Sequence, residues 1–327
     1  MLFRETLARG IAQDFGIEVV GTAADPFIAR DKILELQPDV ITLDVDMPKM
    51  NGIEFLRKLM PQYPLPVVVV SAVSSNVFDA LNAGAVDFVT KPDMHRTGGM
   101  NSFINELIIK IKIASTAKVG RYKKEYIPVK SISDIEIKKN IIIAIGASTG
   151  GTEAIFEIIK AFPRDMPPIV IVQHMPPVFT RMYSDRLNNS CILEVKEAKD
   201  GDEVRSGRVL IAPGDLHMKV MKNSESYYVK CYLGEKVSGH CPSVDVLFDS
   251  VAKAAGEEAI GLILTGMGSD GAKGLLNMKK QGAYTIGQDE KSCIVYGMPM
   301  VAFNIGAVQK QAPLNKIPQM VCDLLTR

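Results

Sequence analysis

A serine that could act as a nucleophile lies in a glycine-rich turn, Gly-Ala-Ser-Thr-Gly-Gly at residues 146–151. The turn joins the apolar run Ile141–Ile145 to a helical pattern at Thr152–Ala161. It fits G-x-S-x-G, in which small neighbours permit a sharp turn that leaves the hydroxyl exposed above a sheet. The free amides of the following helix would favour negative charge developing beside Ser148.

Two other interpretations of this turn remain open on the segment alone: a glycine-rich turn without chemistry, or a phosphate cradle. A dinucleotide site is not favoured, because it requires G-x-G-x-x-G and an acidic residue about 20 positions on. Here the second position after Gly146 is Ser148, and the next predicted strand ends in Gln173-His174.

A serine nucleophile needs a general base, and the best candidate is His174. It ends the predicted strand Ile169–Gln173, and the carboxyl ends of neighbouring strands in a doubly wound sheet meet in one crevice. The other histidines are less suited. His95 lies in the first half of the chain, and His217 and His240 lie in a loop-rich part where surface or structural histidines are common.

The third member of a triad would be a buried acid that holds the imidazole tautomer. Asp270 follows the apolar run Ile260–Leu264 and a glycine-rich turn, and it precedes a helical pattern. It could equally cap that helix. The backbone amides of the same turn, that of Met267 in particular, could donate to an oxyanion. The chain order Ser, His, Asp differs from that of α/β-hydrolases, so the elbow does not imply that fold.

The elements that must position these residues alternate between short apolar strands and helices, which predicts parallel sheets covered on both faces. We expect two doubly wound α/β domains: residues 1–115, flavodoxin-like, and residues 140–327, Rossmann-like. Between them, residues 116–139 are rich in Lys and Arg and predict a linker. A polar hairpin is expected at Met218–Leu233.

Composition excludes several classes of protein. The 327 residues are 47% apolar and 23% charged, and 38 basic residues nearly balance 37 acidic ones, so nothing indicates nucleic-acid binding. No apolar run approaches the roughly 20 residues that span a bilayer. The five cysteines are scattered and odd in number, which fits a reducing cytoplasm better than disulfides or structural zinc.

Taken together, these motifs resemble the catalytic domain of the chemotaxis protein-glutamate methylesterase family. The resemblance covers nearly all of the second half of the chain. The stretches that carry it are Ile145–Thr152, Gln173–Arg181, Ile211–Met218, Ser243–Phe248 and Leu264–Gly271. It implies that Ser148, His174 and Asp270 are the triad.

The resemblance also implies an activity. Family members hydrolyse methyl esters on glutamates of chemoreceptors, release methanol, and in many cases deamidate receptor glutamines. The ester chemistry needs no metal or organic cofactor.

The first half resembles a response-regulator receiver. Asp44 and Ser71 end predicted strands, and Lys91 follows the last one, so the three groups would meet at one sheet edge. The resemblance implies that Asp44 accepts a phosphoryl group from a chemotaxis histidine kinase, that Ser71 is the switch hydroxyl, and that Lys91 binds the phosphate. Asp44 and the backbone carbonyl of Asp46 would bind Mg²⁺.

One departure from receivers is plain: the usual first strand, which ends in two acidic residues that hold most of the magnesium, is absent. The chain starts at Met1-Leu2-Phe3-Arg4, which looks like the loop and helix after that strand. Because the rest of the receiver sequence looks intact, we expect a start codon upstream. The alternative is an incomplete receiver with damaged regulation.

Three functions other than a methylesterase are also compatible with parts of the sequence. One is a receiver joined to a phosphate- or ligand-binding module without hydrolase activity. A second is a transcriptional regulator, against which the absence of a helix-turn-helix pattern and of a basic surplus counts. The third is a general carboxylesterase, which only the family resemblance separates from an enzyme with a protein substrate.

Overall fold

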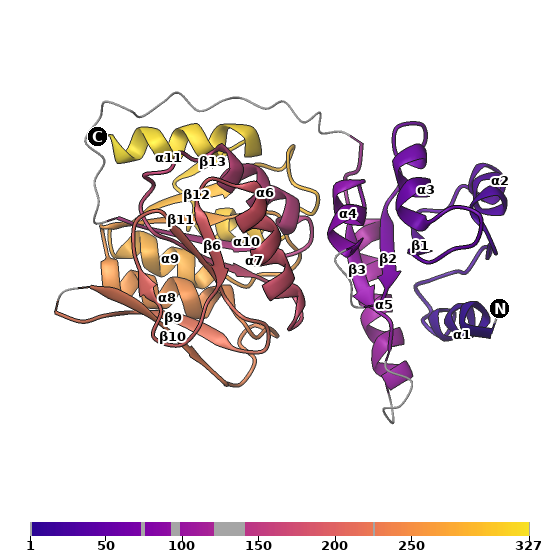
Figure 1. Ribbon diagram of the computed structural model, residues 1–327, viewed down its shortest axis with the longest axis horizontal. Coiled ribbons are helices and arrows are strands. Elements are labelled where there is room, and N and C mark those ends of the chain that lie inside the picture. Colours follow the sequence, from indigo (N-terminus) through magenta and orange to yellow (C-terminus); the bar gives the residue numbers. More distant parts are fainter. Residues whose placement is uncertain (1, 73–75, 93–98, 121–140, 225, 327) are drawn as a thin grey trace. The chain divides into compact units, whose positions relative to one another are not determined.

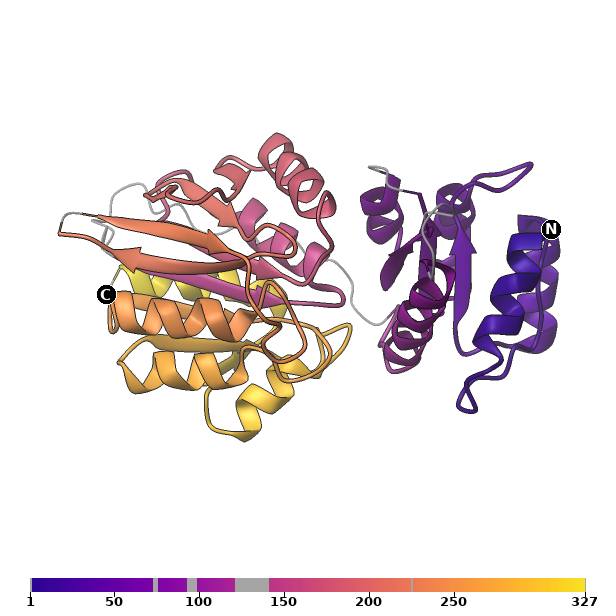
Figure 2. The same ribbon diagram turned by 90° about the horizontal axis from the view of Figure 1, so that it is seen from below.

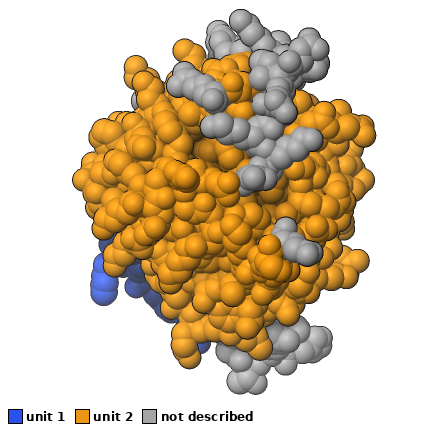
Figure 3. Space-filling model, turned by 90° about the vertical axis from the view of Figure 1, so that its left-hand side faces the viewer, with its two compact units in different colours: residues 1–122 blue, residues 123–327 orange. Residues whose placement is uncertain are grey.

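The computed structural model describes residues 2–72, 76–92, 99–120, 141–224 and 226–326. The chain forms two compact units, residues 1–122 and 123–327 (Figure 3). Each contains its own parallel sheet with packed helices (Figure 1), so the predicted α/β class with two parallel sheets is confirmed. Of the expected linker, residues 121–139 lie outside the described part of the chain.

The sheet of the second unit has seven strands, and every neighbouring pair is parallel. In spatial order they are β13 (Lys310–Ala312), β12 (Tyr284–Gln288), β11 (Ala259–Ile263), β4 (Ile142–Ala147), β5 (Ile169–Gln173), β8 (Arg208–Ile211) and β6 (Glu194–Glu197). The central strands β11, β4 and β5 are buried along their whole length. Continuous β-branched and aliphatic sequence is what a strand covered on both faces requires.

Helices cover both faces of this sheet (Figure 2). On one face pack α6 (Gly151–Ala161), α7 (Phe179–Ser190) and α11 (Ile317–Leu325), next to the short 3₁₀ helix Leu314–Lys316. On the other pack α8 (Val244–Ala255), α9 (Ala272–Lys280) and α10 (Met298–Asn304). Buried Phe248 and Leu247 of α8 belong to the core of that face.

A second, antiparallel sheet of three strands packs against α8, in the order β7 (Glu203–Val204), β10 (Tyr227–Tyr232), β9 (His217–Lys222). The predicted hairpin at Met218–Leu233 is therefore present. It is not polar on both sides, because Met218, Val220 and Val229 are buried against the core.

The first unit has a three-stranded parallel sheet, β1 (Ile41–Asp44), β2 (Val67–Ser71) and β3 (Asp87–Thr90), in that order. Its helices are α1 (Leu2–Ile11), α2 (Pro26–Leu36), α3 (Gly52–Leu59), α4 (Asn76–Asn82) and α5 (Gly99–Ser115). Helix α1 packs on α5, and α2 packs on α3. Only β2 is buried throughout.

The strand predicted at Ile17–Thr22 is wrong, since these residues join no β-ladder. A flavodoxin-like order would pair them with a strand that the described residues do not contain, and β1 is hydrogen-bonded to β2 alone. A strand needs a neighbour to satisfy its backbone groups, whatever its sequence favours. Val20 of this segment consequently remains exposed.

Candidate active site

The carboxyl edge of the seven-stranded sheet brings three predicted residues together. β4 lies between β5 and β11, so Ser148 after β4, His174 after β5 and Asp270 in the loop after β11 share one edge. Backbone bonds extend the ladder past the strands: the His174 amide donates to Ala147 (3.1 Å), and the Ser148 amide donates to Thr265 (3.0 Å). The strand order therefore places the three side chains.

The turn that carries Ser148 is tight. Gly150 has φ 78°, a left-handed conformation that glycine adopts without strain, and the Gly151 amide donates to the Ser148 carbonyl (2.7 Å). Across the crevice, a methyl group added to Gly266 would lie 2.7 Å from Cβ of Ser148, so glycine is required there by close packing. The serine itself is half-buried, at the edge of the crevice.

Gln173, to which the sequence analysis gave no role in the site, links the backbone of Ser148 to that of His174. The Gln173 carboxamide donates to the carbonyls of Ser148 (2.9 Å) and His174 (3.1 Å) while its side chain is buried. One side chain thus links the ends of β4 and β5. The available signal was a polar residue closing an otherwise apolar strand, which is unusual where burial is complete.

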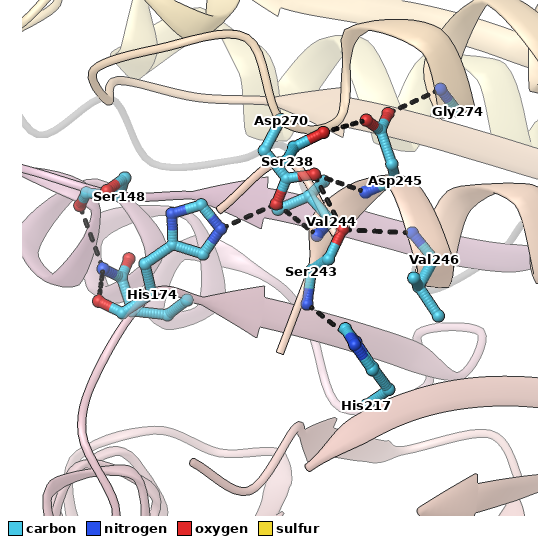
Figure 4. Close-up of polar contacts among 11 residues, drawn as sticks. Ser148, His174, His217, Ser238, Ser243, Val244, Asp245, Val246, Asp270 and Gly274 are labelled. Carbon is cyan, nitrogen blue, oxygen red and sulfur yellow. Dashed lines mark hydrogen bonds and ion pairs between the residues drawn. The ribbon is translucent and has the colours of Figure 1, made fainter. Parts of the chain in front are cut away.

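The imidazole of His174 lies between Ser148 and Asp270 (Figure 4). Nε2 is 2.8 Å from Oδ2 of Asp270, and the ring nitrogen on the Ser148 side, Nδ1, is buried without a hydrogen-bond partner among the described residues. Because Asp270 accepts only, it fixes the proton on Nε2 and leaves Nδ1 as the basic nitrogen. This is the arrangement that a general base requires.

Asp270 is buried and accepts four hydrogen bonds. His174 and the Val244 amide reach Oδ2, and the Ser243 hydroxyl and the Asp245 amide reach Oδ1, at 2.7–3.0 Å (Figure 4). Burial alone would raise the pKa of Asp270, but the hydrogen bond and charge of His174 and the two amides hold it below its usual value.

The alternative in which Asp270 caps the helix that follows it is wrong. The cap position of α9 is Gly271, with no side-chain hydrogen bond. Asp270 accepts instead from the first amides of α8, a helix that begins 26 residues earlier in the chain. The positive end of α8 therefore stabilises the carboxylate that orients His174.

The comparisons with known proteins show the family of this chain. The family model for CheB methylesterase matches residues 143–321, and the response regulator receiver domain matches residues 1–97. A protein-glutamate methylesterase/protein-glutamine glutaminase 2 of Syntrophomonas wolfei is 61% identical over the whole chain and 96% of its own length. This chain belongs to the CheB methylesterase family.

Two further relatives are informative. A protein-glutamate methylesterase/protein-glutamine glutaminase of Salmonella typhimurium is 45% identical over 98% of this chain and 93% of its own. The crystal structure of the Thermotoga maritima CheB methylesterase catalytic domain is 39% identical, covers 56% of this chain and 98% of its own, and superposes with a TM-score of 0.55. The resemblance stated from the sequence is confirmed.

The remaining residues predicted for the methylesterase site lie as follows. Met267 follows Gly266 and is exposed, and its backbone amide has no hydrogen-bond partner in the described part of the chain. His217 is not on the surface: it is a buried structural residue. His240 was set aside from the sequence, but its ring contacts that of His174. His95 lies outside the described residues.

The receiver also gathers its predicted groups at a sheet edge. The Lys91 ammonium is 2.8 Å from Oδ1 of Asp44 and 3.8 Å from Oδ2 of Asp46, and the Asp46 amide donates to Asp44. The Lys91 amide donates to the carbonyl of Ser71, which is buried at the end of β2. The strand ends thus place carboxylate, cation and hydroxyl on neighbouring strands.

The magnesium ligands of this receiver do not form a full set. Asp44 and Asp46 lie at the edge, but the described residues contain no group of three or more acidic, histidine or cysteine side chains that could hold a metal. Mg²⁺ usually keeps several waters and is held by one or two carboxylates together with phosphate oxygens. Asp44 and Asp46 could therefore supply part of its ligand set beside a phosphoryl group.

No helix among the described residues is long and apolar enough to cross a bilayer.

Proposed function

We propose that this chain is a phosphorylation-regulated serine hydrolase that demethylates glutamate methyl esters on chemoreceptors and deamidates certain receptor glutamines. The names of its relatives, protein-glutamate methylesterase/protein-glutamine glutaminase, support the substrate class. The observation that carries the chemistry is His174, with Nε2 on Asp270 and a free Nδ1 turned toward Ser148.

In the first step, Nδ1 of His174 takes the proton of the Ser148 hydroxyl as its oxygen attacks the ester carbonyl. The tetrahedral oxyanion forms where the Met267 amide and the amides at the start of α6 can donate to it. Asp270 stabilises the imidazolium without taking its proton.

In the second step, the imidazolium returns the proton to the leaving oxygen, and methanol departs from an acyl-enzyme on Ser148. Water then attacks the acyl group, with His174 again as base, and releases the glutamate carboxylate. A glutamine substrate would follow the same course with ammonia as the leaving group. Apart from the attacking water, the proposed steps use side chains and backbone amides of this chain.

The proposed partners follow from the family of the chain and from the names of its relatives. The substrates are the cytoplasmic parts of methyl-accepting receptors, which places the proposed activity in the cytoplasm. In the receiver, Asp44 is the proposed phosphoacceptor for a chemotaxis histidine kinase, with Lys91 as the cation that holds the phosphoryl group and Ser71 as the switch hydroxyl.

Methanol release from methylated receptor membranes tests the proposal, with the full chain compared with Ser148→Ala. We expect the variant to lose about 10⁶-fold in kcat, the loss typical of removing a serine nucleophile. A second arm adds a phosphodonor to the parent and to Asp44→Asn, and only the parent should respond. Release that persists in Ser148→Ala would refute the hydrolase, and equal stimulation of both proteins would refute phosphorylation at Asp44.

A binding module without hydrolase activity would show no release from the folded parent. In that case Ser148→Ala should change the affinity for a phosphate-bearing ligand. A general carboxylesterase would hydrolyse small esters as well as it hydrolyses receptors.

A further inference from the structure

One face of the His174 ring is covered by a second histidine. The imidazoles of His174 and His240 are stacked, with ring centroids 3.7 Å apart and planes 9° from parallel. His240 belongs to residues 233–243, the segment between β10 and α8, which we call the strap. Nothing in the triad chemistry above uses this contact.

The strap turns sharply where it meets the catalytic ring. Val237 and His240 exchange both backbone hydrogen bonds (3.0 and 2.9 Å), and the two residues between them, Ser238 and Gly239, have φ 53° and 83°. This is a two-residue turn with both central residues left-handed, which costs energy at a serine. The Ser238 hydroxyl donates to Oδ2 of Asp245 (3.1 Å), a bond that holds the turn against α8 (Figure 4).

Both ends of the strap are anchored by His217. Its Nε2 is 2.8 Å from the Glu235 carbonyl, and its Nδ1 accepts from the Ser243 amide at 3.3 Å. A carbonyl only accepts and an amide only donates, so one neutral tautomer of His217 satisfies both. Gly234 packs so closely that an added methyl group would lie 2.9 Å from the His217 ring.

Asp270 alone does not fix the catalytic imidazole. A ring held by one hydrogen bond at Nε2 can still swing about its side-chain bonds, which moves Nδ1 away from Ser148, because terminal sp³–sp² torsions are broad. The ring of His240, stacked on the face of the His174 ring, restricts this rotation.

We propose that His240 is a positioning residue of the hydrolase, held by the strap so that it keeps Nδ1 of His174 directed at Ser148. The inference rests on the proposed function above, since it names a further residue of the same site. It assigns a use to a ring contact that the triad chemistry above leaves unused.

The test compares three substitutions in the full chain by methanol release: His240→Ala, His240→Phe and His240→Leu. Loss of the ring in the Ala and Leu variants should lower kcat by about 10- to 100-fold, the effect of a misdirected catalytic group, with KM changed less than about threefold. The Phe variant keeps a flat ring and should retain kcat within about threefold of the parent. Lys236→Ala, an exposed change on the same strap, serves as the matched control.

A second readout does not depend on activity. In protein labelled with ¹⁵N-histidine, the proton shared by Nε2 of His174 and Asp270 gives a downfield signal that His174→Gln identifies by its loss. We expect this signal in the parent and in His240→Phe, and broadening or loss of it in His240→Ala.

Two outcomes would overturn the proposal. One is a kcat of His240→Ala within about twofold of the parent, with the signal of His174 unchanged, since a misplaced catalytic group should cost far more. The other is equal loss in the Ala and Phe variants, which would show that the ring itself is not what acts. If the parent shows no Ser148-dependent release, the proposed function fails, and the NMR comparison alone decides whether His240 orients His174.

Discussion

Both units place their reactive groups at the carboxyl edge of a parallel sheet, but they hold those groups differently. In the second unit Asp270 is 2% exposed and accepts four hydrogen bonds, two of them from the start of α8. In the first unit the side chain of Asp44 is 34% exposed, and its contacts are Lys91 and the Asp46 amide. One carboxylate is enclosed and the other is open to solvent.

The difference follows from the sheets. Seven strands with helices on both faces leave the ends of β4 and β5 inside a deep core, where the side chain of Gln173 can bridge them. Three strands, with β1 at the edge, leave Asp44 near solvent. Preorganised catalysis needs enclosed groups that are held by fixed hydrogen bonds. A carboxylate that must meet a phosphodonor needs to be open to solvent. In both units the parallel strands bring the reactive groups to one edge of the sheet. The burial and hydrogen bonding around those groups then determine their chemistry.

In the comparison of the two units, the largest expected effect comes from replacing each carboxylate by its amide. Asp270→Asn should lower kcat by about 10⁴-fold, because the amide no longer holds His174 in the required tautomer. It should also destabilise the second unit by about 1–3 kcal/mol, since an amide nitrogen would face a backbone N–H of α8. Asp44→Asn loses one solvent-screened ion pair and should cost its unit less than about 1 kcal/mol.

Urea unfolding of the full chain, with each transition assigned to its unit, measures both costs, and methanol release measures kcat. Equal destabilisation of the two units by the two substitutions would contradict the claim that Asp270 is enclosed by its surroundings and Asp44 is not. Retention of kcat in Asp270→Asn would show that the amide orients His174 as well as the carboxylate does.

The next largest expected effect is a difference in amide hydrogen-exchange rates between β4 and residues 18–22. Amides of β4 should exchange at least about a thousandfold more slowly than unprotected amides, because they open only with much of the fold. Amides of residues 18–22 donate no backbone hydrogen bond to any other described residue and should exchange within about tenfold of the unprotected rate. Mass spectrometry of exchanged peptides measures both. Strong protection of residues 18–22 would mean that a partner strand forms in solution.

These regions also show what sequence can and cannot predict. The edge that gathers Ser148, His174 and Asp270 was predictable, because apolar strand patterns and the rule for parallel sheets fix where strands end. The error at Ile17–Thr22 arose because a strand-like sequence forms a strand only beside a neighbour. Whether a pairing partner is present is not a local property of the sequence.

The contacts that refine the active site depend on residues distant in the chain. Asp270 accepts from the start of α8, which its own segment does not reveal, and local sequence suggested that it capped α9 instead. His240 reaches His174 through a turn whose position is fixed by Asp245 and His217. Each depends on packing between elements, which periodicity and motifs do not encode.

The smallest expected effect concerns the second buried carboxylate beside the triad, Asp245. Burial and the charge of Asp270 raise its pKa, although the Gly274 amide and the Ser238 hydroxyl donate to it. A raised pKa in the folded state means that the folded chain binds more protons than the unfolded one, so this group's contribution to stability falls as pH rises above about 3.9. Asp270, whose pKa is lowered, acts in the opposite direction and loses its contribution as pH falls.

Asp245→Asn should therefore gain stability relative to the parent as the pH is raised from about 4 to about 7, because the asparagine has no charge to bury. Its carbonyl can still accept from the Gly274 amide and its NH₂ can donate to the Ser238 hydroxyl, so the strap keeps its anchor. Urea midpoints of the second unit at several pH values measure the difference, with Asp323→Asn on the exposed face of α11 as the control for removing one charge. A constant difference between Asp245→Asn and the parent would show that Asp245 titrates alike in the folded and unfolded chains, and would leave Asp270 as the one carboxylate of this site whose ionisation the fold controls.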